Sequence, residues 1–453
     1  MFETLKNALK VKEIRMKLLW TVLLLVVFRL GCIIPIPGLK RDIFSEAFEG
    51  NDFLQIMSAI TGNALSNGTL FALGIGPYIN ASIIVQLLCF GIPALERLSK
   101  EGEDGRKKIA QLTRYVAIGL AVIQSVGIIV NFAVQGNGSE SAINTNLFGG
   151  ELFGPEAATW IAGVYMTVVY TAGACLVMWL GDRMTEYGIG NGMSMIIFIG
   201  IICSAGQALI KTFGRMPGLF SGSVPDAEAA FWELIGFVIV TVFLFAAIVT
   251  VDLAERKIPV QYAKQVKGRK QYGGQRSEIP MRIAASGVMP LIFAFAIISV
   301  PSMIISIFFP DQTPENNWWL WIQSGDGQWI YSILLTVLIF AFAFFYAQIQ
   351  FNPDDVAKSI QQNGGFIQGI RPGRPTAEFL KKISGRITLF GAIYLSLVAF
   401  VPSLIFSLAT NGNSDLVSVF STTGILIVVS VAMEFDKQLQ AQLMMKNYKG
   451  FLK

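Results

Sequence analysis

The stretch LFALGIGPYINASIIVQLLC, residues 70–89, decides the fold class because it is an apolar run long enough to cross a bilayer. About 20 apolar residues span the hydrocarbon core as a helix. Gly74, Gly76 and Pro77 interrupt the first half of the run. Such residues are tolerated in a membrane helix where neighbouring protein or a cavity satisfies the loosened backbone. The run therefore predicts a membrane helix that packs inside a bundle.

One face of this helix changes from apolar to polar along its length. Ile75 and Ile79 are four residues apart, and the same face continues through Ser82 and Gln86. A helix that lines a passage has a use for such a face. An isoleucine pair in a membrane helix is far more often ordinary packing. The pattern alone leaves both interpretations open.

The composition is that of a polytopic membrane protein. Of the 453 residues, 53% are hydrophobic and only 14% are charged, whereas about a quarter of the residues in an average soluble domain are charged. The chain has no histidine, which excludes His-ligated metals and Ser-His or Cys-His nucleophiles. Its four cysteines stand apart without a CxxC pair and are expected to be inert packing residues. No cofactor or metal is expected.

Ten spans are predicted from the lengths of the apolar runs. The first run is too long for the core of a cleavable signal peptide, so it is kept as a span. An even number places both termini on the same side of the membrane. The ten spans are 18–36, 70–89, 116–133, 160–180, 193–210, 231–251, 283–309, 329–351, 387–409 and 416–433.

Lys and Arg decide which side that is. The loops on the side of the termini hold 30 of these residues and the opposite loops hold 4. Because positive charge stays in the cytoplasm, both termini are predicted to be cytoplasmic. The one remaining basic residue, Arg29, lies inside the first run and is expected to extend outward to the bilayer surface rather than serve a buried site.

The segment 53–67, FLQIMSAITGNALSN, is left over between the first two spans. It is apolar, uncharged, rich in small residues and too short to cross a bilayer, so it predicts a re-entrant or half-inserted helix on the outer side. An amphipathic helix that lies on the outer bilayer surface is the alternative.

The two halves of the chain are predicted to be spans one to five, residues 1–210, and spans six to ten, residues 231–435, with a hinge at 211–230. Because five is odd, copies of one unit would enter the membrane from opposite sides. A cytoplasmic tail follows at 436–453.

Two long loops on the basic side are rich in Lys and Arg. Loop 252–281 alternates at Ile258, Val260 and Tyr262 and turns near KGRK, residues 267–270, which predicts a two-stranded hairpin with a basic tip. Loop 352–385 carries Arg371 and Arg374 on a Gly/Pro-rich turn. Lys and Arg on such loops can do no more than set the membrane topology and contact anionic lipid headgroups. They can also bind ribosomal RNA or an acidic protein surface.

No motif for enzyme chemistry is found. The sequence lacks GxxxxGK[ST] and GxSxG, and the GIGNG at 188–192 is read as a tight cap at the start of the fifth span. Ionisable residues are almost absent from the spans, although an ion-coupled carrier needs such a site. A passive channel served by partners is therefore favoured over a secondary transporter with inverted repeats and over an intramembrane enzyme.

Six motifs spread along the chain resemble the SecY family, the pore subunit of the bacterial protein translocase. The similarity is collinear from residue 16 to the tail, and its motifs are FRLGCIIPIPG at 28–38, FALGIGPYINASIIVQLL at 71–88, KEGEDGRKKIAQLTRY at 100–115, MWLGDRMTEYGIGNGMSMIIF at 178–198, IPVQYAKQVKGRK at 258–270 and GIRPG at 369–373.

The resemblance implies an all-α fold of ten membrane helices in two inverted five-helix halves, a clamshell around an hourglass pore. Secretory polypeptides would cross through the pore, and signal sequences and membrane segments would leave sideways through a lateral gate. Stiff apolar side chains at a constriction offer a passing chain no hydrogen bonds. The implied ring is Ile75, Ile79, Ile197, Ile292 and Ile427, and the implied plug is segment 53–67 with the small residues Ser58, Ala59, Gly62 and Ala64.

The implied lateral gate has one departure from the family pattern. Ala284 stands on span seven where the family usually has an asparagine, while Asn80 on span two occupies a place that is often serine. Gln124 is retained, and Ser286 also belongs to the implied gate. We expect the polar contact across the gate to be rearranged, which changes how hydrophobic a signal must be.

Partners are also implied by the resemblance. Arg269, Lys270, Arg371 and Arg374 match the family's cytoplasmic docking positions for the motor ATPase SecA and the ribosome. The small subunits SecE and SecG, unfolded preproteins, anionic lipids, SecDF and YidC complete the expected partners, and the expected location is the bacterial cytoplasmic membrane.

Overall fold

The computed structural model describes most of the chain. The described residues are 2–40, 58, 61–134, 155–215, 226–262, 265–267, 270–272, 276–283, 289–308, 317–323, 328–410 and 422–450. The chain divides into two compact units, each of which is discontinuous in sequence. The first comprises Met1–Phe237, Ala296–Tyr331 and Phe406–Lys453, and the second comprises Val238–Phe295 and Ser332–Ile405.

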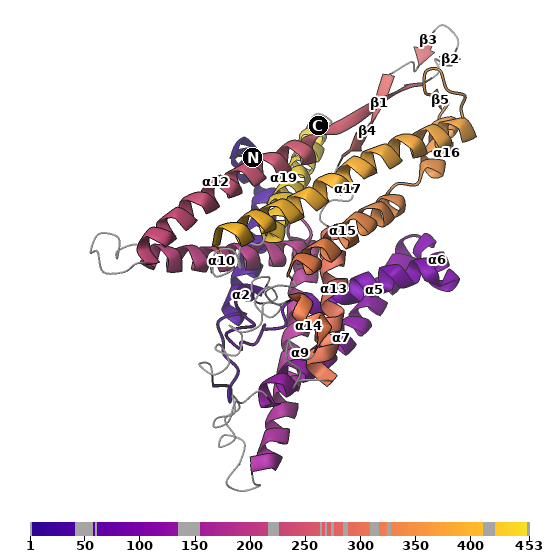
Figure 1. The fold of residues 1–453 in the computed structure, drawn as a ribbon. Helices are drawn as coiled ribbons and strands as arrows, with labels where there is room; N and C mark the ends of the chain where they lie inside the picture. Colours follow the sequence, from indigo (N-terminus) through magenta and orange to yellow (C-terminus); the bar gives the residue numbers. More distant parts are fainter. Residues whose placement is uncertain are drawn as a thin grey trace. The chain divides into compact units, whose positions relative to one another are not determined.

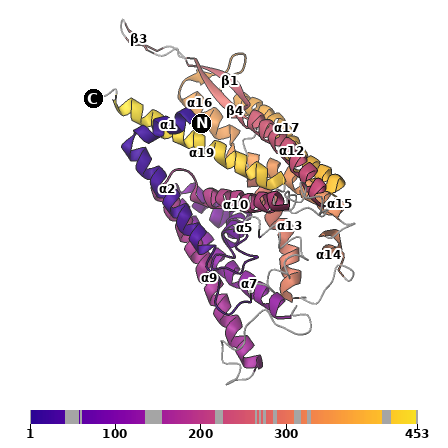
Figure 2. The ribbon, with the colours of Figure 1, turned by 90° about the vertical axis from the view of Figure 1, so that its left-hand side faces the viewer.

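A long helix lies at each of the ten predicted spans (Figures 1 and 2). Within the described residues, five helices are long and apolar enough to cross a membrane on their own, and a bent pair makes a sixth. The ten helices are α2 (Lys12–Gly31), α5 (Gly76–Gly91), α7 (Glu103–Val134), α9 (Pro155–Tyr187), α10 (Gly192–Arg215), α12 (Asp226–Leu253), α13 (Met289–Phe308), α15 (Gln328–Gln350), α17 (Arg374–Thr410) and α19 (Thr422–Gly450).

Short helices accompany the spans. They are α1 (Phe2–Lys10), α6 (Pro93–Lys100), α14 (Trp318–Gln323) and α16 (Pro353–Gln362). Helix α6 follows α5 at a bend of 107°. The predicted hinge at 211–230 is shorter than expected, because α10 continues to Arg215 and α12 begins at Asp226. Residues 216–225 lie outside the described part, and the division into halves stays a prediction.

Helix α5 begins later than the apolar run predicts. Residues 70–75 are turns, and the helix runs from Gly76 to Gly91. Gly74 has a left-handed backbone with φ +52°, which only glycine adopts at no steric cost. Pro77 lies in the first turn of the helix, where its missing N–H is not needed. The interruption seen in the sequence therefore marks the start of the helix, with Ile75 as its N-cap.

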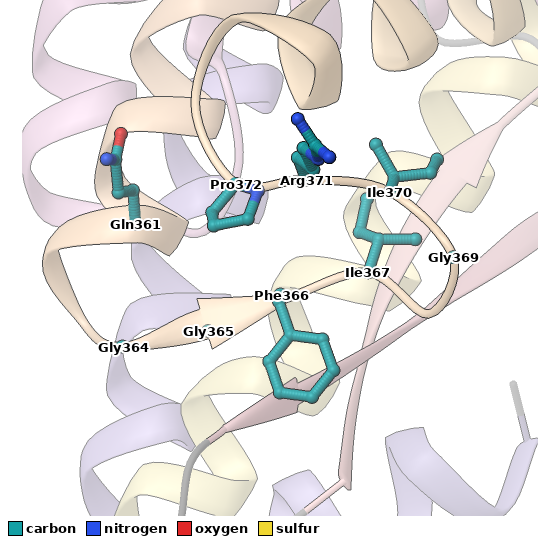
Figure 3. Close-up of a pocket in the computed structure, with 9 residues that line it drawn as sticks. All are labelled: Gln361, Gly364, Gly365, Phe366, Ile367, Gly369, Ile370, Arg371 and Pro372. Carbon is teal, nitrogen blue, oxygen red and sulfur yellow. The ribbon is translucent and has the colours of Figure 1, made fainter.

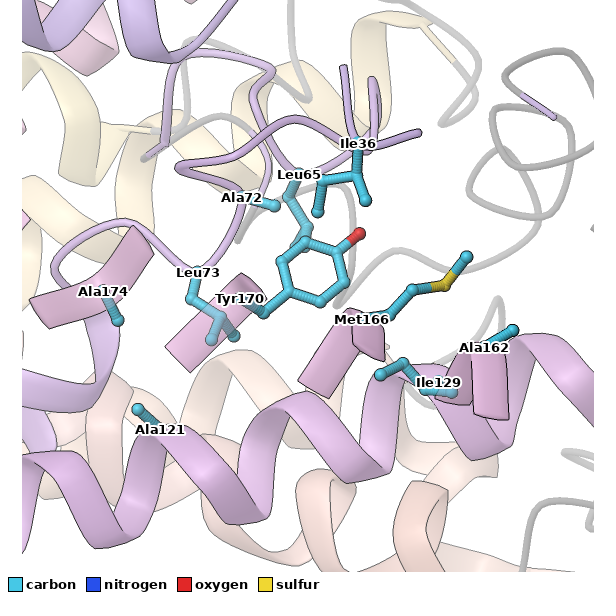
Figure 4. Packing of buried hydrophobic residues seen from close by; sticks show 10 residues of the cluster. All are labelled: Ile36, Leu65, Ala72, Leu73, Ala121, Ile129, Ala162, Met166, Tyr170 and Ala174. Carbon is cyan, nitrogen blue, oxygen red and sulfur yellow. The ribbon is translucent and has the colours of Figure 1, made fainter. Parts of the chain in front are cut away.

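Small residues let the helices of the first unit approach closely. Its main cluster joins Ile36 and the turn residues Leu65, Ala72 and Leu73 to α7 and α9 (Figure 4). The α7 and α9 members are Ala121, Ile129, Ala162, Met166, Tyr170 and Ala174. Figure 4 shows the Tyr170 ring beside Leu65 and Leu73. The non-helical residues before α5 are therefore packed against two membrane helices.

Polar side chains form contacts at the start of α10 and between α7 and α9. Asn191 in the GIGNG motif accepts a hydrogen bond from the Met193 N–H at 3.0 Å, which is the side-chain cap that a helix N-terminus needs. Its neighbour Gly190 has φ +93°. Arg114 of α7 pairs with Asp182 of α9 at 2.8 Å. The tight cap at the start of α10 is confirmed.

The N-terminal and C-terminal helices of the first unit also pack together. Ala8 and Ile14 form a cluster with Ile189 and with Leu439 of α19, and Figure 2 shows α1 lying along α19. The two chain ends are therefore held in one unit by a small apolar contact.

The second unit carries the strands. Strands β1 (Glu255–Tyr262) and β4 (Arg276–Arg282) pair antiparallel, with Ile258 opposite Ile279, and β2 (Gln265–Lys267) pairs with β3 (Lys270–Tyr272). Figure 1 shows β2 and β3 at the end of this hairpin. Lys267 is opposite Lys270, so the predicted hairpin and the place of its turn are confirmed. A third strand, β5 (Gly365–Phe366), pairs with β1 on the other edge.

A matched pair of glycines tests the close packing in the first unit. A Cβ on Gly173 of α9 would overlap the carbonyl oxygen of Leu70, so Gly173→Ala is expected to lower the free energy of unfolding by about 1–3 kcal/mol. A Cβ on Gly163 of the same helix would lie 3.7 Å from Ile129 Cγ2, so Gly163→Ala is expected to be neutral or stabilising. Thermal unfolding in detergent measures both, and equal losses would contradict the packing.

Candidate functional site

The five isoleucines of the implied ring are divided between the two units. Ile75, Ile197 and Ile427 in the first unit are 3%, 5% and 6% exposed. Ile79 in the first unit and Ile292 in the second are partly buried. Ile197 on α10 and Ile427 on α19 belong to two helices that pack against each other. None of the five is a lipid-exposed side chain, and the ring itself stays a prediction.

The mixed face of α5 is present as the sequence predicts. The Ile79 N–H donates to the Ile75 carbonyl at 3.1 Å, so the two isoleucines lie one helical turn apart. Further along, Gln86 Nε2 donates to Ser82 Oγ at 3.3 Å. The two polar side chains of this face, Ser82 and Gln86, therefore hydrogen-bond to each other within the helix. The apolar part of the face, at Ile75 and Ile79, is the part that a passage could use.

The left-over segment is not a continuous helix. Its helix ends at Thr61, and residues 62–68 form turns. Gly62 and Asn63 have φ +73° and +62°, and the Asn63 N–H donates to the Ser58 carbonyl at 2.8 Å. This is the hydrogen bond of a Schellman motif, which ends a helix at a left-handed residue. The helix predicted through residue 67 is therefore too long.

The described part of this segment, Ser58 and residues 61–67, is largely buried in protein. Ser58, Ala64 and Leu65 are 4%, 0% and 5% exposed, so the alternative of a helix on the bilayer surface is wrong. The Leu70 N–H donates to the Ile34 carbonyl at 3.0 Å and the Ile36 N–H to the Gly68 carbonyl at 3.1 Å. These bonds join the segment to the chain that leaves α2. Ala59 lies outside the described residues.

Arg29 does not extend to the bilayer surface as expected. Its Nε donates to Cys203 Sγ of α10 at 3.0 Å, and its guanidinium lies against Gly62 of the buried segment. The expectation was wrong because a hydrogen-bond acceptor and an open glycine backbone lie within its reach. Cys203, which we expected to be only a packing residue, is that acceptor.

The implied gate is only partly described. Asn80 on α5 and Gln124 on α7 are both partly buried, and these two helices pack against each other around Ala81, Ala117 and Met178. Ala284 and Ser286 lie outside the described residues. The gate therefore stays a prediction.

The two basic loops form one folded platform, which we define as β1, β4, β5, α16 and the start of α17. Backbone pairing of Gln261 with Phe366 and of Tyr262 with Gly365 joins the loops. A shared apolar cluster lies beneath them, made of Ile258, Val260, Met281, Ile360, Ile367, Leu380 and Ile383. The burial of Ile258 and Val260 confirms the predicted alternation.

The sequence analysis missed β5 and α16, which complete this platform. Helix α16 had a readable signal, because Asn352 accepts from the Asp354 N–H at 3.2 Å and Pro353 follows at the first helical position. Gly364 after the helix has φ +68°. An Asn-Pro start and a glycine stop are typical of helix ends. A two-residue strand has no comparable signal.

A cavity of about 540 Å³ lies at the loop that follows β5 (Figure 3). It is lined by Gln361, Gly364, Gly365, Phe366, Ile367, Gly369, Ile370, Arg371 and Pro372. Arg371 is exposed, and its carbonyl accepts from Thr376 Oγ1 at 2.8 Å. Arg374 is also exposed and lies 3.3 Å from Glu378. Arg269 and the Lys270 side chain lie outside the described part.

The fold defines the class of protein. A solved structure of the SecY protein, whose plug domain is described as stabilising the closed state of the translocation channel and maintaining a membrane seal, matches with a TM-score of 0.64 and 18% identity, covering 94% of this chain and 92% of that one. Sec61 in the canine ribosome–channel complex from the endoplasmic reticulum matches with a TM-score of 0.62 and 17% identity, over the same 94% and 92%. The chain has the fold of membrane protein-conducting channels.

Sequence comparison gives the family. The SecY family model matches residues 69–435. The protein translocase subunit SecY of Streptomyces griseus is 39% identical over 464 residues, which cover 100% of both chains. This chain belongs to the SecY family. The all-α fold with ten membrane helices that the resemblance implied is confirmed, and the protein is a membrane channel for protein translocation.

Proposed function

We propose that unfolded secretory polypeptides cross this channel through a collar formed by Ile75, Ile79, Ile197, Ile292 and Ile427. The observation that carries this proposal is the chemistry of the five positions together with their burial, because none is an exposed side chain among the described residues. Stiff aliphatic side chains give a moving chain no hydrogen bond to hold, and a narrow apolar constriction dewets when it is empty.

The segment around Ser58, Ala59, Gly62 and Ala64 is proposed as the plug of this channel. It is supported by the burial of Ser58 and Ala64 and by the turn geometry at Gly62. A compact block of turns, closed by its own hydrogen bonds, can move as a unit without exposing many unpaired backbone groups.

Signal sequences and membrane segments are proposed to leave sideways between α5 and α7 on one side and α13 and α15 on the other. Asn80 and Gln124 belong to the first pair, and Ala284 and Ser286 precede α13 in the sequence. The partial burial of Asn80 and Gln124 supports this assignment, because a polar side chain between membrane helices requires a partner.

The channel itself is proposed to be passive. The sequence has no nucleotide-binding motif and almost no ionisable residue within its spans, so the energy would come from SecA or the ribosome. SecE and SecG would bind in the membrane, and SecDF and YidC would act beside them. The proposed location is the bacterial cytoplasmic membrane, with both termini in the cytoplasm, on the distribution of Lys and Arg.

Docking of SecA or the ribosome is proposed on the platform, around Arg269, Lys270, Arg371 and Arg374. The exposed Arg371 and Arg374 side chains stand on a loop whose base is fixed by β5 and by the cluster under it. The planar guanidinium of arginine presents several N–H donors that pair with phosphate or carboxylate groups. Anionic lipid headgroups would meet the same side of the protein.

Site-specific crosslinking tests the collar. In a variant whose four native cysteines are changed to serine, Ile75→Cys and Ile292→Cys are each expected to crosslink to a secretory chain stalled during translocation. Val242→Cys is the control, because this α12 side chain is 63% exposed and is expected to face lipid. Crosslinking at Val242 but not at the two isoleucines would contradict the proposed route.

The gate is tested by Asn80→Ser. A hydroxyl offers fewer hydrogen bonds than an amide, so the closed gate is expected to be weakened and weakly hydrophobic signals to be exported about two- to tenfold faster. The measurement is the export rate of two preproteins that differ only in signal hydrophobicity. An unchanged ratio between the two preproteins would argue against a gate contact of Asn80.

The docking surface is tested by Arg371→Glu. Replacing a cation by an anion is expected to weaken the binding of purified ribosomes to vesicles that contain the channel roughly tenfold, with the loss largest at low salt. Lys107→Glu on α7 makes the same change of charge at a residue that is not part of the platform and that lies 3.6 Å from Glu103. Equal loss in both variants would indicate a general charge effect and would contradict docking at Arg371.

A further inference from the structure

We propose that the plug is latched to α10 by two adjacent contacts, and that this latch sets how readily the empty channel opens. The first contact joins Asn63 to Gln207, and the second places Arg29, held by Cys203, against Gly62. The inference rests on the proposed role of this segment as the plug and names the residues that would hold it closed.

The Asn63 contact is made from the turn that ends the helix at Thr61. Asn63 is the one residue other than glycine with a positive φ in the described part of the chain, and asparagine is one of the few side chains that adopt the left-handed region readily. Its Nδ2 donates to Gln207 Oε1 of α10 at 2.6 Å. The residue therefore both shapes the turn and joins it to α10.

The backbone of Asn63 is occupied locally, so its side chain is the part that reaches α10. The Asn63 carbonyl accepts from Asn67 Nδ2 at 2.8 Å and from Ser66 Oγ at 3.1 Å. These bonds hold the turn in shape whether or not Gln207 is engaged. Loss of the Gln207 contact would therefore release the plug from α10 without unfolding the turn.

The second contact uses the neighbouring residue and the same face of α10. Cys203 and Gln207 are one helical turn apart and lie on the same face. Arg29 Nε donates to Cys203 Sγ at 3.0 Å, and a Cβ on Gly62 would lie 2.9 Å from Arg29 Nη2 and closer still to Nη1. A cation inside a membrane span is costly and is a functional candidate by default. In this protein the Arg29 guanidinium fills the space beside the backbone of Gly62 in the plug.

The strength of these contacts suits a latch rather than permanent packing. Asn63 and Gln207 form a neutral hydrogen bond that is exposed, and such a bond changes an equilibrium constant by only about two- to tenfold. The hydrophobic packing of the segment is at a different residue, Leu65, which lies in the cluster with α7 and α9. A substrate that enters the channel would therefore break the hydrogen bond between Asn63 and Gln207 at little cost in free energy.

The test is the ion leak of proteoliposomes that contain the full chain with no substrate. Gln207→Leu removes the acceptor and is expected to raise the leak about two- to tenfold. Gln207→Glu keeps the acceptor and is expected to leak like the parent. Ile210→Ala on the same helix, at a side chain that is 73% exposed, is the control for general damage to α10. Equal leak in the leucine and glutamate variants would overturn the latch.

A second variant approaches the same bond from the plug. Asn63→Gly keeps the left-handed backbone, because glycine adopts it freely, and it removes only the side chain. It is expected to raise the leak as much as Gln207→Leu does, and the double variant is expected to leak no more than either single one, since both remove one interaction. Additive effects would show that the two residues act separately and would contradict the proposal.

The Arg29 contact is tested through its acceptor. Cys203→Ser retains an oxygen that accepts from Arg29 Nε and is expected to keep the leak of the parent, whereas Cys203→Ala is expected to raise it about two- to fivefold. Crosslinking of a stalled chain to Ile75→Cys, in the variant whose four native cysteines are serine, reports on the channel independently. If that variant crosslinks while Gln207→Leu, Asn63→Gly and Cys203→Ala all leak no more than the parent, the latch is refuted and the proposed function stands.

Discussion

The structure depends on the requirement that every backbone polar group at membrane depth has a partner. Helices meet this requirement within themselves, and the turns at 62–75 meet it in part with backbone bonds such as Thr69 N–H to the Ala64 carbonyl. Thr61 and Thr69 add side-chain bonds, to the Ser58 carbonyl and the Ala64 carbonyl at 3.0 Å each. Two backbone bonds join the turns to the chain after α2. A non-helical block can therefore lie inside a helical membrane protein, and a movable plug needs that property.

The same requirement, met outside the spans, explains the platform. A strand edge with unpaired N–H and C=O groups invites unwanted pairing, and β1 is covered on one edge by β4 and on the other by β5. Pairing two loops that are about a hundred residues apart in sequence also gives both of them a common apolar base. Exposed basic side chains such as Arg371 are thereby held on a surface of fixed shape, which is what a large partner can recognise.

Basic residues outside the membrane spans and the single arginine inside a span, Arg29, have different roles. The basic residues outside the spans are proposed to fix the orientation in the membrane and to offer a surface to anionic partners. Arg29, inside a span, contacts Cys203 and the backbone of Gly62 instead. A channel that must let many different chains pass has little use for charge along its route, because a fixed charge would bind some of them and repel others. The proposed apolar collar, with polar contacts kept at the proposed plug, would meet both needs.

The sequence alone determined the ten helices, the interruption before α5, the hairpin with its turn at 267–270 and the cap at Asn191, because each follows from composition or from residues a few positions apart. Its motifs also gave the family. Only the tertiary structure decided where helix gives way to turns at Gly62, that β5 joins the two basic loops, and that Arg29 meets Cys203. Those features come from contacts between residues up to 174 positions apart, and local propensity carries no information about which distant acceptor or strand edge a residue will reach.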